Sequence, residues 1–159
     1  MYKTMLLSQS EIEELLTMDE VIETVEEVFT AHGNDQVVMP AKITLDLSKM
    51  RKTAWTNAMP AYIAPLGASG IKWAGGYIDN REKNMPYVVA TIILQDPDTG
   101  IQFVVMDGAH ITNLRTGAAA AVVAKKFCAR GAGKVAIIGA GVQGRTSLWA
   151  LTRLMEVSE

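Results

Sequence analysis

A glycine-rich turn near the C-terminal end of the sequence most constrains what this chain can fold into. The apolar run Lys134–Ile138 leads directly into the motif G-x-G-x-x-G, and a plausible amphipathic helix follows. In such motifs the first glycine permits a tight turn, the second lets the backbone approach a pyrophosphate, and the third lets the helix pack against the strand. The amides at the helix start then face the phosphates. The cofactor-binding residues that this motif predicts are Gly139, Gly141, Val142, Gln143 and Gly144.

The motif predicts only the opening strand and helix of a dinucleotide-binding domain. In such domains an acidic residue that holds the adenine ribose lies ~20 residues further on, after a second strand. That position falls beyond Glu159. The choice between NAD and NADP therefore stays open at this point, because the residue that decides it is outside the sequence. A plain glycine-rich turn that binds no nucleotide is the alternative.

The composition narrows the classes of partner. The chain is 49% hydrophobic and 20% charged with a formal net charge of −2, so we expect neither a nucleic acid nor a membrane as a partner. No apolar run approaches the ~20 residues that span a bilayer, and the N-terminus does not resemble a secretory leader, so we expect a cytoplasmic protein. The single cysteine, Cys128, excludes an internal disulfide, and we expect it to be a small buried residue. We expect no metal site.

Two helices are predicted at the N-terminus. Ser8 with Glu11, and Thr17 with Glu20, have the spacing of a capping box, in which a hydroxyl and a carboxylate satisfy the first amides of a helix. Apolar residues recur after Thr17 at the helical spacing i, i+1, i+4, i+7 and i+8. We expect this second helix to end near Gly33, which suits a C-terminal cap.

Strand-like runs separated by turn signals follow. Asp96–Gly100 (DPDTG) is a hairpin signature, because proline presets one turn dihedral and glycine supplies a positive one. Short connections of this kind favour an antiparallel or mixed sheet, packed by the N-terminal helices. The five predicted strands are Ala41–Leu47, Thr53–Ile63, Gly70–Ile78, Val88–Gln95 and Ile101–Met106.

The remaining pattern divides the chain into two parts. An alanine-rich run over about His110–Phe127 predicts a long helix, and Ala129–Gly133 (ARGAG) resembles a linker. The predicted fold is therefore an α+β domain over residues 1–128, with two helices and a mixed sheet. The first β-α unit of a Rossmann α/β domain follows over residues 129–159.

Several separate motifs occur in an order that is similar to the ornithine cyclodeaminase/mu-crystallin family. They are MPAY at Met59–Tyr62, GIKWAGGYIDN at Gly70–Asn80, Pro86, ILQDPDTG, MDGAHITNLRTGAAAAVVAKKF and IIGAGVQG. The resemblance covers nearly the whole chain. In that family the nucleotide domain continues for many residues and a C-terminal segment returns to the first domain. The resemblance therefore implies that this chain is the N-terminal half of such a protein.

The family resemblance also implies a substrate site. It assigns Lys42, Lys72 and Arg115 to a substrate carboxylate, Lys72 to catalysis, and Thr116 to the cofactor. The chemistry agrees, since a lysine within an apolar strand is costly to bury without an anion and a guanidinium binds a carboxylate with two hydrogen bonds. Alternatively, Lys72 points outward from an edge strand and Arg115 is a surface residue or a phosphate contact. Many relatives have arginine at Lys42, and many have a small hydroxyl residue at Tyr87.

The other notable side chains have simpler interpretations. We assign no catalytic role to His32 or His110, and we expect Asp107 to belong to a turn. The tryptophans are interpreted as core or interface anchors. They are Trp55, Trp73 and Trp149.

The activity that the resemblance implies is conversion of L-ornithine to L-proline and ammonia, by internal hydride transfer through bound NAD. A catalytic aspartate of the family would lie beyond the sequence. Alternatives with the same scaffold are a cyclic ketimine reductase and an alanine dehydrogenase, so the substrate class is a small amino acid or a cyclic imine. A binding protein without turnover, like mu-crystallin, and a short docking module are alternatives of other classes. The resemblance also implies a homodimer formed through the first domain.

Overall fold

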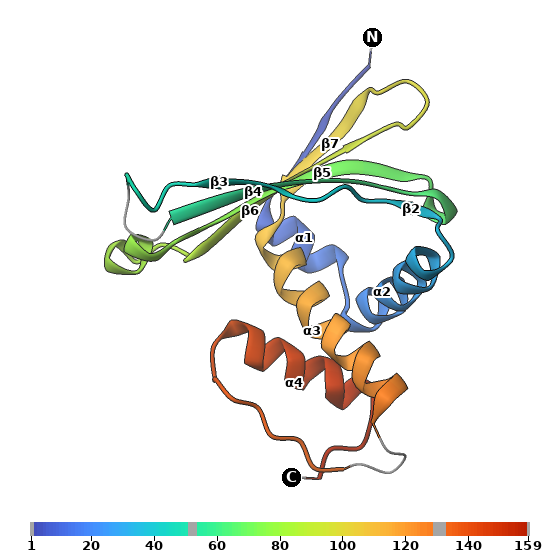
Figure 1. The fold of residues 1–159 in the computed structure, drawn as a ribbon, viewed down its shortest axis with the longest axis vertical. Helices are drawn as coiled ribbons and strands as arrows, with labels where there is room; N and C mark the ends of the chain where they lie inside the picture. The colour runs from blue at the N-terminus through green and yellow to red at the C-terminus, as the bar shows by residue number, and fades with distance from the viewer. Residues whose placement is uncertain (1, 51–53, 129–132, 159) are drawn as a thin grey trace.

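The computed structural model describes residues 2–50, 54–128 and 133–158. A mixed sheet lies on one side of the molecule, and the helices lie on the other (Figure 1). The strands are β1 (Met5–Leu7), β2 (Val37–Val38), β3 (Ile43–Asp46), β4 (Ala54–Ile63), β5 (Ala68–Tyr77), β6 (Val88–Gln95) and β7 (Gln102–Asp107). The helices are α1 (Gln9–Leu15), α2 (Met18–Gly33), α3 (Ala109–Phe127), α4 (Val142–Leu154) and the short 3₁₀ helices η1 (Ala64–Leu66) and η2 (Ile78–Lys83).

Both N-terminal helices begin at their predicted capping boxes. The Ser8 amide donates to the Glu11 carboxylate at 2.7 Å, and the Glu11 amide donates to the Ser8 hydroxyl at 3.4 Å. Thr17 and Glu20 form the same pair of bonds, at 3.0 and 3.3 Å. α2 then continues to Gly33, as predicted. These reciprocal bonds confirm the two helix starts, because each satisfies amides that have no partner within the helix.

The sheet has the order β1-β7-β6-β5-β4-β2, and β3 also pairs with β4. β1 runs parallel to β7 and the other pairs are antiparallel, which confirms a mixed sheet. The five predicted strands correspond to β3–β7, although residue 53 lies outside the described part of the chain. β1 and β2 were missed because runs of 3 and 2 residues are too short to show alternation.

The predicted hairpin joins β6 to β7. The Asp96 carboxylate accepts hydrogen bonds from the amides of Asp98, at 3.1 Å, and Thr99, at 2.7 Å. Gly100 has φ +72°, in the left-handed region that glycine adopts without strain. The turn therefore forms through the aspartate and the glycine that predicted it.

The core lies among α2, α3 and α4. Gly117 lets α3 and α4 approach closely, since a Cβ at Gly117 would lie 2.4 Å from the Thr146 carbonyl oxygen. Within the described residues, no helix is both long and apolar enough to cross a bilayer. The core cluster consists of Met18, Ile22, Leu114, Ala118, Ala121, Val122, Ala150 and Leu151.

Ion pairs join the same three helices at the surface. The Glu26 carboxylate on α2 pairs with Lys125 at 2.7 Å and with Lys126 at 2.8 Å, both on α3. These two ammonium groups hold the pKa of Glu26 at about 2. Arg153 on α4 pairs with Asp19 on α2. This last ion pair connects α4 to α2 across the predicted boundary between the two parts of the chain.

Two predictions near that boundary are wrong for this structure. Lys134–Ile138 does not form a strand, and Ile138 is fully exposed at 104%. A buried parallel strand requires neighbouring strands, and the described residues supply none beside it. Cys128 is exposed rather than buried, because it directly follows the last residue of α3, Phe127, which is itself exposed. Of the predicted linker, residues 129–132 lie outside the described part of the chain.

The close approach of α3 and α4 yields a stability prediction. We expect Gly117→Ala to lower the free energy of unfolding by roughly 1–3 kcal/mol, because the added methyl group overlaps the α4 backbone. Gly33→Ala on α2 is the matched control, since a Cβ there meets nothing within 4 Å. We expect it to be neutral or stabilising by up to about 1 kcal/mol. Urea unfolding of both variants measures the difference, and equal stabilities would contradict the packing argument.

Candidate active site and cofactor cleft

Lys72 lies in the interior of the sheet. It belongs to β5, which pairs with β4 on one side and β6 on the other, so the alternative of an edge strand is wrong. The register sets Lys72 opposite Met59 and Ile92, which places these side chains on the same face. Lys72 is half-buried, and its Nζ donates a long hydrogen bond of 3.5 Å to Thr112 Oγ1 on α3. This face of β5 is therefore the one that α3 covers.

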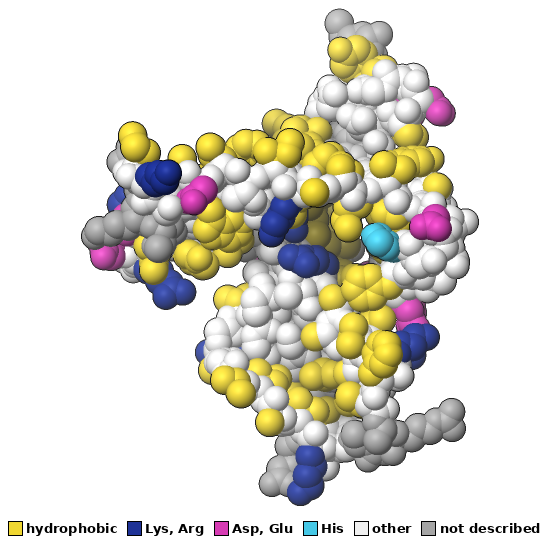
Figure 2. Space-filling view, in the orientation of Figure 1, with side chains coloured by type: hydrophobic (Ala, Val, Ile, Leu, Met, Phe, Trp, Pro, Cys, Tyr) yellow, Lys and Arg dark blue, Asp and Glu magenta, His cyan; other side chains and the backbone are white. Residues whose placement is uncertain are grey.

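Lys72 and Arg115 form a cationic pair that has no counter-ion among the described residues. Burial lowers the pKa of Lys72 to about 8, and the nearby Arg115 guanidinium acts in the same direction. Burial also lowers the pKa of Arg115, although more than a third of its surface stays exposed. Within the part of the chain that the structure describes, neither residue forms a salt bridge with a carboxylate. Figure 2 shows Lys and Arg side chains at a hollow between the sheet and the helices. Two such charges without a partner favour an anionic ligand.

Lys42 is less closely associated with this pair. It is exposed and lies one residue before β3. Continuing the β3–β4 register by one residue sets Lys42 opposite Met59, in the same cross-strand row as Lys72. It forms no hydrogen bond or salt bridge with the described residues. The structure therefore brings Lys72 and Arg115 together but leaves Lys42 at the rim.

Thr112 is a site residue that the sequence reasoning missed. It is 8% exposed, it contacts Lys72, and its carbonyl oxygen accepts a 2.7 Å bond from the Thr116 hydroxyl. Thr112 precedes Arg115 by three positions, a spacing that puts both on one helix face. That spacing in TNLRT was the available signal. Thr116 is a predicted cofactor contact, and in this structure its hydroxyl is hydrogen-bonded to the backbone of its own helix.

The glycine turn is tight, as its motif predicts, although Lys134–Ile138 before it forms no strand. Gly139 has φ +103°, and a Cβ on Gly144 would lie 2.0 Å from the Gly139 carbonyl oxygen. A Cβ on Gly141 would meet nothing within 4 Å, so the space above it is open. α4 starts at Val142 without a capping side chain among the described residues. The open space and the uncapped amides fit a phosphate group of a dinucleotide.

This turn forms one wall of a cleft of about 580 Å³. The start of α3 and the segment that follows β5 form the opposite wall. Gln143 Nε2 donates a 3.2 Å hydrogen bond to Asn113 Oδ1 on α3, which joins the two walls. Asn113 was also missed by the sequence reasoning. The lining residues from the walls facing the turn are Gln9, Arg81, Pro86, Tyr87, Val88, Ala109 and Asn113.

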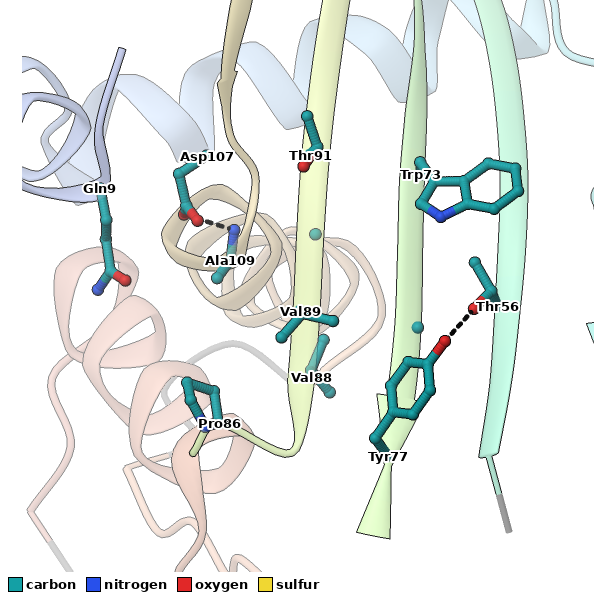
Figure 3. Close-up of a pocket in the computed structure, with 12 residues that line it drawn as sticks. Gln9, Thr56, Trp73, Tyr77, Pro86, Val88, Val89, Thr91, Asp107 and Ala109 are labelled. Atoms are coloured by element: carbon teal, nitrogen blue, oxygen red, sulfur yellow. Dashed lines mark hydrogen bonds between the residues drawn. The ribbon is translucent and has the colours of Figure 1, made fainter. Parts of the chain in front are cut away.

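A second cavity, of about 300 Å³, adjoins the cleft (Figure 3). The Tyr77 and Thr56 hydroxyls lie 3.0 Å apart on one side of it, and on the other the Asp107 carboxylate accepts a 2.8 Å bond from the Ala109 amide. Asp107 therefore lies at the predicted turn and satisfies the first amide of α3. Four residues line both cavities, but neither cavity is lined by Lys72 or Arg115. The shared residues are Gln9, Pro86, Val88 and Ala109.

Comparison with known proteins finds similar proteins that match nearly the whole chain. Alanine dehydrogenase of Archaeoglobus fulgidus is 36% identical over 157 residues, which cover 99% of this chain and 47% of that protein. A solved archaeal alanine dehydrogenase dimer with bound NAD matches with a TM-score of 0.88 and 37% identity, over 97% of this chain and 46% of the other. The chain thus spans about half the length of these relatives.

A further solved structure supports the same fold. The Thermococcus litoralis Δ1-pyrroline-2-carboxylate reductase, in complex with NADH and L-proline, matches with a TM-score of 0.90 and 39% identity, over 97% of this chain and 47% of that one. The model of the ornithine cyclodeaminase/mu-crystallin family matches residues 2–159. The resemblance seen in the sequence is confirmed. This chain belongs to the ornithine cyclodeaminase/mu-crystallin family.

Proposed function

We propose that the protein transfers hydride between a nicotinamide cofactor and the α-carbon of a small amino acid or cyclic imino acid. The observation that carries this proposal is the pair of half-buried Lys72 and the more exposed Arg115, which has no carboxylate partner among the described residues. The same helix that carries Arg115 also forms a wall of the cleft beside the glycine turn. An anion site and a phosphate-binding turn on one helix suit a substrate carboxylate beside a dinucleotide.

Each predicted residue receives a role in this proposal. Arg115 binds the substrate carboxylate with two hydrogen bonds, and Lys72 neutralises it from the sheet. Before a ligand binds, burial holds the pKa of Lys72 at about 8. Lys72 is also the proposed acid–base group, and its ammonium would donate a proton at the substrate nitrogen. Lys42 contributes from the rim, which predicts a smaller effect. We place Thr116 toward the cofactor.

NAD is the proposed cofactor, held at its phosphates by the turn. The proposed contacts are the amides of Val142 and Gln143, with Gly141 allowing close approach. When bound, NAD supplies the hydride acceptor. The related structures named above contain NAD or NADH, which supports this choice.

The substrate remains a choice among carboxylates with an α-nitrogen. L-Ornithine, converted to L-proline and ammonia, is the substrate that the family name implies. The 36–39% identities to an alanine dehydrogenase and a pyrroline-2-carboxylate reductase favour L-alanine and cyclic imino acids equally. A binding protein without turnover is the alternative of another class. Retention of both Lys72 and Arg115 favours an enzyme, because both serve the reacting end of the substrate.

We also propose a homodimer formed through the open face of the sheet. The register places a set of apolar side chains, 42–73% exposed, on the face opposite Lys72, where Figure 1 shows no helix. A two-fold axis would bury this face against an identical copy. The archaeal alanine dehydrogenase relative is a dimer. The residues of this open sheet face are Leu6, Val38, Ile43, Leu45, Trp73 and Val89.

The first test concerns turnover. In the natural protein we expect NAD-dependent activity with at least one of L-ornithine, L-alanine and Δ1-pyrroline-2-carboxylate, followed by cofactor absorbance and by proline formation. Lys72→Ala and Arg115→Ala should each lower kcat/KM by about 100-fold or more, because truncation leaves a charge without its partner. Lys42→Ala should lower it less than tenfold. Equal activity of all three variants and the parent would contradict the carboxylate site.

The second test concerns pH. Pyruvate, a carboxylate that does not titrate between pH 6 and 10, should bind the NADH complex most tightly below pH about 8, where Lys72 is protonated. Above that pH the association constant should fall by up to about tenfold per unit, since one proton must be taken up with the ligand. Lys72→Arg should flatten the profile, because arginine stays charged throughout. Calorimetric titration measures the association constant of both proteins at each pH. A flat profile of the parent would exclude Lys72 as a group that binds the carboxylate.

The third test concerns the oligomer. Leu45→Glu should raise the dimer dissociation constant at least tenfold in sedimentation experiments, because it buries a charge in the proposed interface. Leu15→Glu is the matched control, at a residue 61% exposed on α1, away from the open sheet face. Loss of the dimer in both variants, or in neither, would count against this face.

A further inference from the structure

Arg81 lies in the wall of the cleft opposite the glycine turn. It comes from η2, and both Arg81 and Tyr87 line the cleft together with Gly139, Gly141 and Val142. The Arg81 guanidinium carbon lies 5.1 Å from the centre of the Tyr87 ring, over its face. This is a cation–π contact, which holds the guanidinium in place without neutralising its charge.

Hydrogen bonds hold the segment that carries these two side chains. Asn80 Nδ2 donates to the Pro86 carbonyl oxygen at 2.9 Å, and the Met85 amide donates to the Asn80 carbonyl oxygen at 2.9 Å. The Tyr77 amide donates to the Tyr87 carbonyl oxygen at 2.9 Å, which anchors the end of the segment to β5. These bonds keep Tyr87, and therefore Arg81, against the cleft before any ligand arrives.

Positive charge faces the cleft from both walls. Arg81 forms no salt bridge with a carboxylate in the described residues, so its five N–H donors stay available. Across the cleft, α4 begins with no acidic residue in its first turn, and its start carries the partial positive charge of a helix. Arg145 lies near that start and donates to the Ala140 carbonyl oxygen at 3.1 Å, although it does not line the cleft. A ligand with two adjacent phosphates matches such a cleft.

We infer that Arg81 is a cofactor-binding residue, which pairs with the pyrophosphate of a dinucleotide seated on the glycine turn. Tyr87 is its positioning residue. The inference rests on the proposed function, in which the turn binds NAD, and it adds a contact that the glycine motif does not contain. Sequence reasoning passed over Arg81 because REKN, in Arg81–Asn84, reads as an ordinary solvated charge run far from the glycines.

Three ligands separate the pyrophosphate from the rest of the cofactor. NADH and ADP-ribose both contain it, and adenosine does not. In the natural protein, Arg81→Ala should weaken NADH and ADP-ribose by the same factor, about 10- to 100-fold for a lost charge-assisted hydrogen bond. Adenosine binding should not change. NADH is titrated by fluorescence, ADP-ribose by calorimetry, and adenosine by ligand-observed NMR.

Matched variants test the mechanism. Lys83→Ala removes an equal charge two residues away, from a side chain that does not line the cleft, and should leave all three affinities unchanged. Arg81→Lys should fall between the parent and Arg81→Ala, since it keeps the charge but loses the planar fork. Tyr87→Phe should bind like the parent, and Tyr87→Leu should lose part of the affinity, because only the latter removes the ring.

The outcomes distinguish this inference from the proposed function. If the parent binds NADH and Arg81→Ala binds NADH and ADP-ribose equally well, the inference is wrong and the proposed function stands. If Arg81→Ala weakens NADH alone, or weakens adenosine to the same degree, the pairing with pyrophosphate is wrong. If the parent binds neither NADH nor ADP-ribose, both proposals fall. Equal losses for the two pyrophosphate ligands, with adenosine and Lys83→Ala unchanged, support the inference.

Discussion

The close contact between α3 and α4 is the constraint on which the rest of the arrangement depends. Gly117 brings the α4 backbone to within reach of α3, and a core of small residues continues the contact along both helices. Ala109 and Asn113 on α3 face the glycine turn. They are four residues apart, and Gly117 follows four residues later on the same helix face. Thr112 lies on the adjacent stripe and meets Lys72. One helix therefore fixes the separation between the cleft beside the glycine turn and the cationic pair.

Electrostatics explains why the cationic pair is informative. A lysine on a buried strand is ordinarily compensated by a carboxylate, as Lys125 and Lys126 are compensated by Glu26 at the surface. Lys72 instead lies beside a second cation. Burial, and to a smaller extent the Arg115 guanidinium, lower its pKa. Such an arrangement reduces stability and is tolerated where an anion completes it. An arriving carboxylate would raise the pKa of Lys72, so ligand binding and proton uptake would occur together.

Local signals in the sequence predicted much of this fold. The capping residues Ser8 and Thr17, the turn at Asp96–Gly100 and the glycines at Gly139 and Gly144 each act through neighbours a few positions away, so their geometry was readable. The failures depended on distant partners. Lys134–Ile138 has the composition of a strand, but the described residues place no strand beside it. Arg81 is far from the glycine turn in the sequence, and only folding sets it opposite that turn. Lys72 and Arg115 were identified through the family resemblance. Their proximity depends on how α3 packs on β5, which the sequence alone does not show.

Strand β5 relates the proposed substrate site to the proposed dimer. Successive residues of a strand point to opposite faces, so Lys72 faces α3 while Trp73, 52% exposed, faces the open side. Small neighbours leave room for the indole, since Ala58 lies opposite it and Gly75 follows on the same face. Burying the open sheet face in a dimer would restrain β5 from the side away from α3. Because Lys72 is adjacent to Trp73 in the strand, this restraint would limit the movement of the Lys72 backbone. Association through this face would therefore order the proposed substrate site without contributing a residue to it.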